Sequence, residues 1–101
     1  MSSKVVTLKV NGSDIALSFF VQSFFDKVLD GMVAALDNTC PVDTLKLDAG
    51  NGDTVLTING ATINMNEFVR SIFRSTAEGM ISSLRDIGKI NSFTIQICMG
   101  K

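Results

Sequence analysis

Apolar and polar residues alternate along two stretches of this chain, and an Asn-Gly pair directly follows each stretch. Residues 5–10 and 54–58 are rich in Val, Thr and Leu, which predicts β-strands. Asn-Gly is the strongest two-residue signal for a hairpin with a type I′ turn. Each chain segment is therefore expected to return through a short second strand, over residues 13–17 and 61–65.

The pattern then changes from a period of two to the period of an α-helix. Ser18 and Asn66 suit helix N-caps, because their side-chain oxygens can accept a free amide of the first turn. The apolar stripes that follow predict two amphipathic helices of about 20 residues, each roughly 30 Å long. The stripes are Phe20, Val21, Phe24, Phe25, Val28, Met32 and Leu36, and Phe68, Val69, Ile72, Phe73, Thr76, Met80 and Leu84. Final strands are expected in residues 44–49 and 92–99.

The two halves of the chain match without a gap when residues 7–53 are laid over residues 55–101. The identical pairs include Asn11/Asn59, Gly12/Gly60, Phe20/Phe68, Phe25/Phe73, Gly31/Gly79 and Met32/Met80. We interpret them as tandem ββαβ repeats, about 4–52 and 53–101, within a single domain that spans residues 1–101. The expected fold is α+β with pseudo-two-fold symmetry, a mostly antiparallel six-stranded sheet and two long helices on one face. The last strand of each repeat is expected to pair with the first strand of the other.

Gly31 and Gly79 interrupt the two helical stripes at matched positions, and Gly inside a helix costs roughly 1 kcal/mol relative to Ala. Small residues, Ala35 and Ser83, stand four positions further on. The favoured hypothesis is that the helices cross near the two glycines, where a missing Cβ lets the backbones approach. The alternative is that each glycine makes room for a bulky residue of the sheet.

The apolar content is high for so small a domain: 46% of the 101 residues are hydrophobic and the mean hydropathy is +0.31. The surplus either fills the core or faces a partner, and the composition leaves both open. The first helix is apolar over a wider arc than the second. Phe19, Leu29 and Val33 are the candidate partner surface, which predicts a protein partner or a homo-oligomer.

The charges differ between the halves. Residues 1–54 hold four lysines and seven aspartates, a net charge of −3, whereas residues 55–101 carry a net charge of +2. Two matched pairs have opposite signs, Asp26/Arg74 and Asp37/Arg85. Such a difference fits duplication followed by specialisation, although two unrelated solvated faces would also produce it. The overall charge of −1 argues against nucleic-acid binding, which needs an excess of basic residues.

No group of residues in the sequence predicts catalysis, a metal site or a cofactor. The chain has no histidine, the commonest general base and metal ligand. Cys40 and Cys98 match no zinc or redox spacing and are expected to be free thiols, with a disulfide as the alternative. No secretory signal and no membrane span are expected, so the chain is interpreted as cytoplasmic.

The second half resembles a segment near the C-terminus of some bacterial molybdopterin-guanine dinucleotide biosynthesis protein B sequences, and related short uncharacterised proteins. The resemblance rests on Asn59-Gly60, Ile63, Asn66, Phe68-Val69, Thr76, Gly79-Met80 and Ser82-Ser83-Leu84. The chain lacks the phosphate-binding loop of that family, so nucleotide binding is not implied.

These observations favour a non-enzymatic assembly or interaction module, which the resemblance would associate with molybdenum or tungsten enzymes. The alternative is a carrier of a small molecule or cofactor with a pocket between helices and sheet. Arg70, Arg74 and the Met32/Met80 pair are the features that would favour such a carrier.

Overall fold

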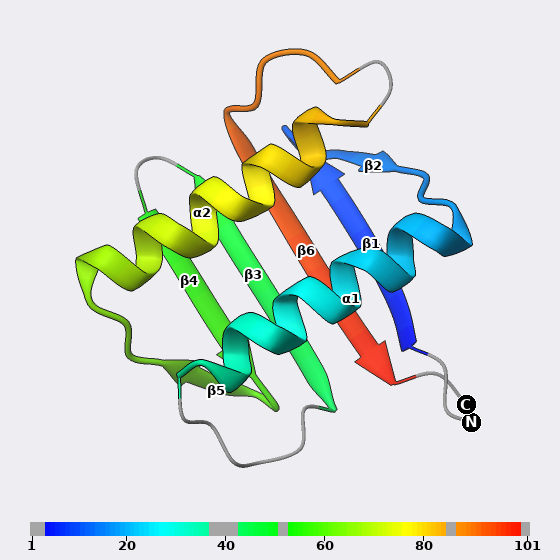
Figure 1. The fold of residues 1–101 in the computed structure, drawn as a ribbon. Coiled ribbons are helices and arrows are strands. Elements are labelled where there is room, and N and C mark those ends of the chain that lie inside the picture. Colours follow the sequence, from blue (N-terminus) through cyan, green and yellow to red (C-terminus); the bar gives the residue numbers. More distant parts are fainter. Residues whose placement is uncertain (1–3, 37–42, 51–52, 85–86, 100–101) are drawn as a thin grey trace.

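The computed structural model of the chain describes residues 4–36, 43–50, 53–84 and 87–99. In chain order the elements are β1 (Lys4–Val10), β2 (Ser13–Ile15), α1 (Phe19–Ala34), β3 (Thr44–Gly50), β4 (Asp53–Ile58), β5 (Ala61–Ile63), α2 (Glu67–Ser82) and β6 (Ser92–Met99). This is an α+β fold in two layers, with both helices on one face of the sheet (Figure 1).

The sheet has six strands in the order β2-β1-β6-β3-β4-β5, and every neighbouring pair is antiparallel. The expected exchange of last strands is confirmed: β6 pairs with β1, where Leu8 lies opposite Ile95, and β3 pairs with β4, where Leu47 lies opposite Leu56. β3 and β6 also pair with each other at the centre of the sheet. The two edge strands are only three residues long, which limits the unpaired backbone that could recruit another strand.

Both Asn-Gly turns have the expected backbone. Asn11 and Asn59 have φ of 53° and 51°, and the glycines that follow have φ of 83° and 84°, so both central residues of each turn are left-handed. The asparagine side chains have a second role that the turn pattern does not reveal. Asn11 Oδ1 accepts hydrogen bonds from the amides of Asn91 and Ser92, at 2.8 and 3.0 Å. Asn59 Oδ1 accepts hydrogen bonds from Asp43 and Thr44 at the same two distances. Each turn therefore holds the start of one of the two central strands.

The two helices are 16 residues each, shorter than the expected 20, and they end at Ala34 and Ser82. Their N-caps are the expected ones: Ser18 Oγ accepts a hydrogen bond from the Val21 amide, and Asn66 Oδ1 accepts one from the Val69 amide. α1 packs mainly over β1, and α2 mainly over β4. Since β6 and β3 lie between those two strands, the helices stand apart over the middle of the sheet.

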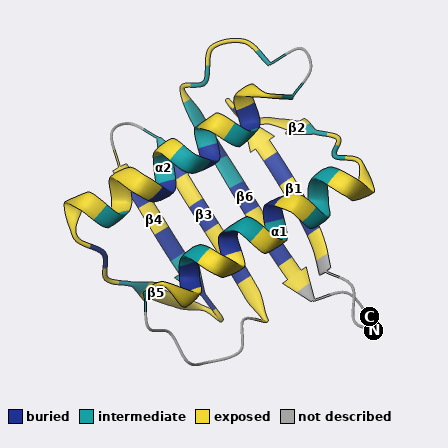
Figure 2. Cartoon of the chain, viewed as in Figure 1, coloured by how far each residue is buried: buried dark blue, intermediate teal, exposed yellow. Residues whose placement is uncertain are grey.

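The hydrophobic core lies between the helices and the sheet, as Figure 2 shows in dark blue. Each helix buries three residues at intervals of four, so that only a narrow stripe of it touches the sheet. The buried residues are Phe25, Leu29 and Val33 of α1, and Phe73, Ala77 and Ile81 of α2. Corresponding elements lie 48 residues apart, as β2 and β5 or α1 and α2 show, and a tandem repeat remains our interpretation of that spacing.

Candidate functional site

The outward surface of the two helices carries large apolar side chains that the core does not cover. Phe20 is 73% exposed and Phe24 50% on α1, and Phe68 is 70% exposed and Ile72 42% on α2. We call the surface formed by these four side chains and the space between the helices the two-helix face. The rings of Phe20 and Phe24 lie beside each other, with their centroids 6.2 Å apart. Phe19, at 80%, is the most exposed of the large apolar residues that the structure describes.

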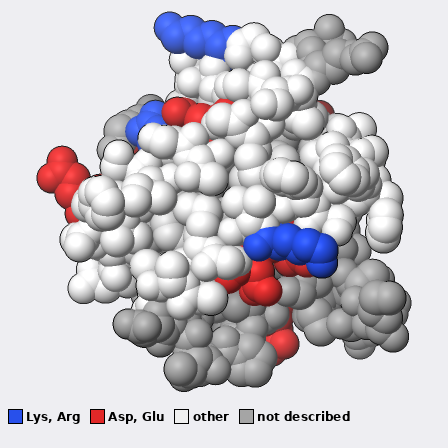
Figure 3. All heavy atoms as spheres, in the orientation of Figure 1, with Lys and Arg blue, Asp and Glu red and all other residues white. Residues whose placement is uncertain are grey.

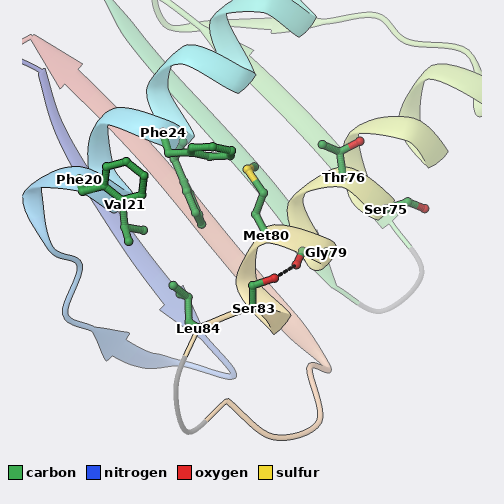
Figure 4. A pocket seen from close by; sticks show the side chains of 10 residues that line it. Phe20, Val21, Phe24, Ser75, Thr76, Gly79, Met80, Ser83 and Leu84 are labelled. Carbon is green, nitrogen blue, oxygen red and sulfur yellow. Dashed lines mark hydrogen bonds between the residues drawn. The ribbon is translucent and has the colours of Figure 1, made fainter.

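A groove runs between the helices, with a wider and a narrower section. The wider section has a volume of about 550 Å³ and the narrower one about 220 Å³. The wider section is lined by Phe20, Val21, Phe24 and Phe25 of α1 and by Ser75, Thr76, Gly79, Met80, Ser83 and Leu84, on or just after α2, and Figure 4 shows their arrangement. The narrower section is lined by Phe68, Val69, Ile72 and Phe73 of α2 and by Met32, Ala35 and Leu36, on or just after α1. The start of each helix therefore lies beside the end of the other, and the helices run antiparallel.

Charged groups stay at the margins of this face. Figure 3 shows a continuous surface without acidic or basic atoms between the helices, with Lys, Arg, Asp and Glu around it. On α2 the guanidinium of Arg74 pairs with Glu78 at 3.3 Å. An apolar centre with a charged rim is the anatomy of a protein–protein contact surface.

The opposite face of the sheet has a different character. Its exposed side chains are mostly polar, and two ion pairs of 4.0 and 3.9 Å, Lys9 with Asp14 and Lys46 with Asp48, lie along it. Thr94 donates a hydrogen bond to Asp48 across neighbouring strands at 2.6 Å. Val5 and Val55 are the large apolar residues exposed there, so this face offers little contiguous apolar surface.

The predicted helix crossing at the glycines is wrong. A Cβ added to Gly31 or Gly79 would meet no atom within 4 Å outside its own helix, and both positions are exposed. Ala35 and Ser83 are the C-cap residues of the helices and line the two sections of the groove. The physical reason is the width of the sheet. Six strands at about 4.8 Å spacing leave two helices room to lie side by side without touching backbones.

The predicted partner surface is wrong in two of its three residues. Phe19 is exposed, but Leu29 and Val33 are only 0% and 2% exposed and belong to the core. Leu29 and Val33 follow Phe25 by four and eight residues, so all three lie on the side of α1 that faces the sheet. The apolar stripes predicted from the sequence include four residues that the structure leaves exposed, Phe20, Phe24, Phe68 and Ile72. In α2 the sequence carried a signal for the exposure of Phe68 and Ile72. Phe73, Ala77 and Ile81 form an apolar stripe at intervals of four residues, and this narrower stripe is the one that is buried.

The two arginines considered for ligand binding do not line the groove. Arg70 donates a hydrogen bond from Nη1 to the carbonyl of Met65 at 3.0 Å, and Arg74 is paired with Glu78. Met32 and Met80 do line it, one in each section. Within the residues that the structure describes, no three Cys, Asp or Glu side chains are placed to hold a metal ion. Cys98 is a free, exposed thiol, whereas Cys40, Asp37 and Arg85 lie outside the described residues.

Comparison with family models, curated proteins and solved structures finds no match to this chain. Neither described helix has the length and the apolar run that a bilayer crossing needs. The arrangement of side chains is therefore the basis for the assignment of a role.

Proposed function

We propose that this chain is a non-enzymatic assembly module that binds a protein partner through the two-helix face. The observation that carries the proposal is the exposure of Phe20 and Phe68, at 73% and 70%, beside an apolar groove. Leaving apolar surface in water is unfavourable by about 25 cal/mol for each Å². Contiguous apolar patches of this kind on a small domain mark contact sites.

The build of the face supports docking without rearrangement. Its side chains stand on helices whose first turns are capped by Ser18 and Asn66 and whose inner sides are anchored in the core by Phe25 and Phe73. Surfaces that are already ordered lose little conformational freedom on binding, and their affinity benefits accordingly. The exposed phenylalanines are the kind of aromatic anchor that contributes most to such contacts.

The test is a capture experiment from extracts of the source cells, with the whole chain as bait. A specific partner should be retained by the parent chain and lost from the double variant Phe20→Ser with Phe24→Ser. Phe19→Ser is the matched control, because Phe19 is as exposed but lies outside both sections of the groove. Equal capture by all three chains, or none by the parent together with no self-association, would contradict the proposal. Molybdenum or tungsten enzymes are the partners that the family resemblance suggests examining first.

A carrier function is the second candidate, and the volume of the groove favours it. A space of about 550 Å³ falls within the usual range of small-molecule sites. Its lining is mostly apolar, which would suit an apolar ligand held against Met80 and Phe24. Native mass spectrometry of the chain purified from its source would detect a ligand that co-purifies. A spectrum with bare chain only would count against a carrier and leave the assembly module in place.

A further inference from the structure

The two-helix face is self-complementary, and we propose that its partner is a second copy of this chain, docked face to face as a symmetric dimer. The inference rests on the proposed function and names the partner for the same surface. Its grounds are the area of the face, the distribution of charge between the helices, and the match between exposed rings and small residues.

The shape of the chain leaves a large face open. The molecule is flat, with extents of 36 × 35 × 19 Å, and the two-helix face occupies one of its broad sides (Figure 1). Each partner in a standard dimer buries about 800 Å², which a side of these dimensions can supply.

The positions of two opposite charges favour one arrangement of the copies. Asp26 and Arg74 lie near the middle of the 16-residue helices α1 and α2. Each is two residues beyond a groove-facing side chain, Phe24 or Ile72, and two residues turn the helix by about 200°. Both charges therefore lie on the sides of their helices away from the groove, at the rim of the face.

Two kinds of two-fold axis can join the faces. An axis parallel to the helices and midway between them places α1 of each copy on α2 of the other. Asp26 then lies opposite the partner's Arg74 at the rim on both sides, and each Arg74 keeps its pair with Glu78 of its own chain. An axis across the helices places α1 on α1 and sets like charges opposite each other, which is unfavourable. The opposite charges of Asp26 and Arg74 favour the first arrangement.

The same arrangement matches large side chains with small ones. Phe20 and Phe24 lie at the end of the groove that Gly79 and Ser83 also line. Rotation about the axis between the helices carries the two rings onto the Gly79 and Ser83 positions of the partner. A Cβ at Gly79 would meet no atom within 4 Å outside its own helix, so open space is available for a ring at that position. The exposed glycine thereby gains a role between chains rather than within one.

Sedimentation equilibrium of the whole chain over a range of concentrations tests the dimer. The expected result is a reversible species of twice 10.9 kDa. Phe20→Ser with Phe24→Ser should weaken the dimer by at least about a hundredfold, because central aromatic anchors dominate such contacts. Gly79→Leu should weaken it by about tenfold or more through loss of fit. Phe19→Ser should stay within about threefold of the parent. All variants should keep the circular dichroism of the parent, since the changed positions are exposed.

Charge reversal tests the arrangement. Asp26→Arg and Arg74→Asp should each weaken the dimer by about five- to tenfold, since each places two like-charged contacts at the rim. The chain that carries both changes should return to within about twofold of the parent. Single reversals that leave the dimer unaltered would overturn the proposed arrangement.

The outcomes separate this inference from the proposed function. A chain that is monomeric at every concentration, forms a larger species, or dimerises irrespective of Phe20 and Phe24 overturns the face-to-face dimer. If such a chain still captures another protein in a way that needs Phe20 and Phe24, the assembly module stands and only its partner is different. If neither association depends on these side chains, both proposals fail.

Discussion

At the scale of single residues, Asn11 and Asn59 connect each hairpin turn to a central strand. Their left-handed backbone suits Asn and Gly alike, but only Asn has an amide oxygen that can accept two backbone hydrogen bonds. The hydrogen bonds that Asn59 Oδ1 accepts fix the start of β3, and those that Asn11 Oδ1 accepts fix the start of β6. Both strands enter the sheet after a loop, so these contacts set where each strand begins to pair.

Substitutions at Asn59 should separate its two roles. Asn59→Gly keeps the turn and removes both side-chain hydrogen bonds, so it should lower the free energy of unfolding by about 1–2 kcal/mol. Asn59→Ala loses the same hydrogen bonds, and alanine tolerates the left-handed backbone less well than glycine or asparagine does, so it should lower the free energy of unfolding by roughly 1 kcal/mol more. Urea denaturation measures both changes. Asn64→Ala, an exposed asparagine after the same hairpin, is the control and should stay within about 0.5 kcal/mol of the parent.

The glycines of the helices lead to a prediction opposite to the one that a helix crossing would give. Because a Cβ at Gly31 has open space around it, Gly31→Ala introduces no clash and improves helix propensity. The variant should be more stable than the parent by about 0.5–1 kcal/mol, measured by urea denaturation at a concentration low enough to exclude self-association. A loss of stability would mean that the position contacts another part of the chain.

At the scale of elements, the sequence specified where the helices start and how the hairpins turn, but it did not specify the rotation of α1. N-caps and Asn-Gly turns act through local backbone geometry, so they can be read from neighbouring residues. Rotation depends on which apolar side chains face the sheet. In α1 the apolar residues occupy more than half of the circumference, and Phe24 is as hydrophobic as Phe25. The choice between them follows from packing against strands that are distant in sequence, so Phe20 and Phe24 were missed as surface residues.

The rotation of α1 can be tested by comparing a buried with an exposed position on the same helix. Leu29 is completely buried against the sheet, so Leu29→Ala should lower the free energy of unfolding by about 2–4 kcal/mol. Phe19→Ala removes a larger side chain that is 80% exposed and should change it by less than about 0.5 kcal/mol. Thermal or urea unfolding of the two variants would contradict the observed rotation if their effects were equal or reversed.

At the scale of the whole molecule, strand exchange makes the two halves of the chain depend on each other. β6 lies between β1 and β3, which both belong to the first half, and β3 lies between β6 and β4, which both belong to the second. Within either half alone, the last strand therefore has no neighbour. This interlocking could be predicted from the matched sequence halves. A hairpin and one helix are too small a unit to bury the apolar face of the hairpin and the apolar face of the helix. A two-stranded hairpin is marginally stable at best in water.

The interlocked sheet predicts that the chain can be cut between its halves and reassembled. Peptides of residues 1–52 and 53–101 should each lack the circular dichroism of the folded chain as monomers, and an equimolar mixture should recover it in a 1:1 complex. The reason is that only the mixture supplies neighbours for β3 and β6. Titration of one peptide into the other, followed by circular dichroism and sedimentation, measures the recovery. A peptide that unfolds cooperatively as a monomer would contradict the prediction. A homodimer of the second half would instead mean that β6 can take the place of β3, which is what a duplicated ββαβ unit requires.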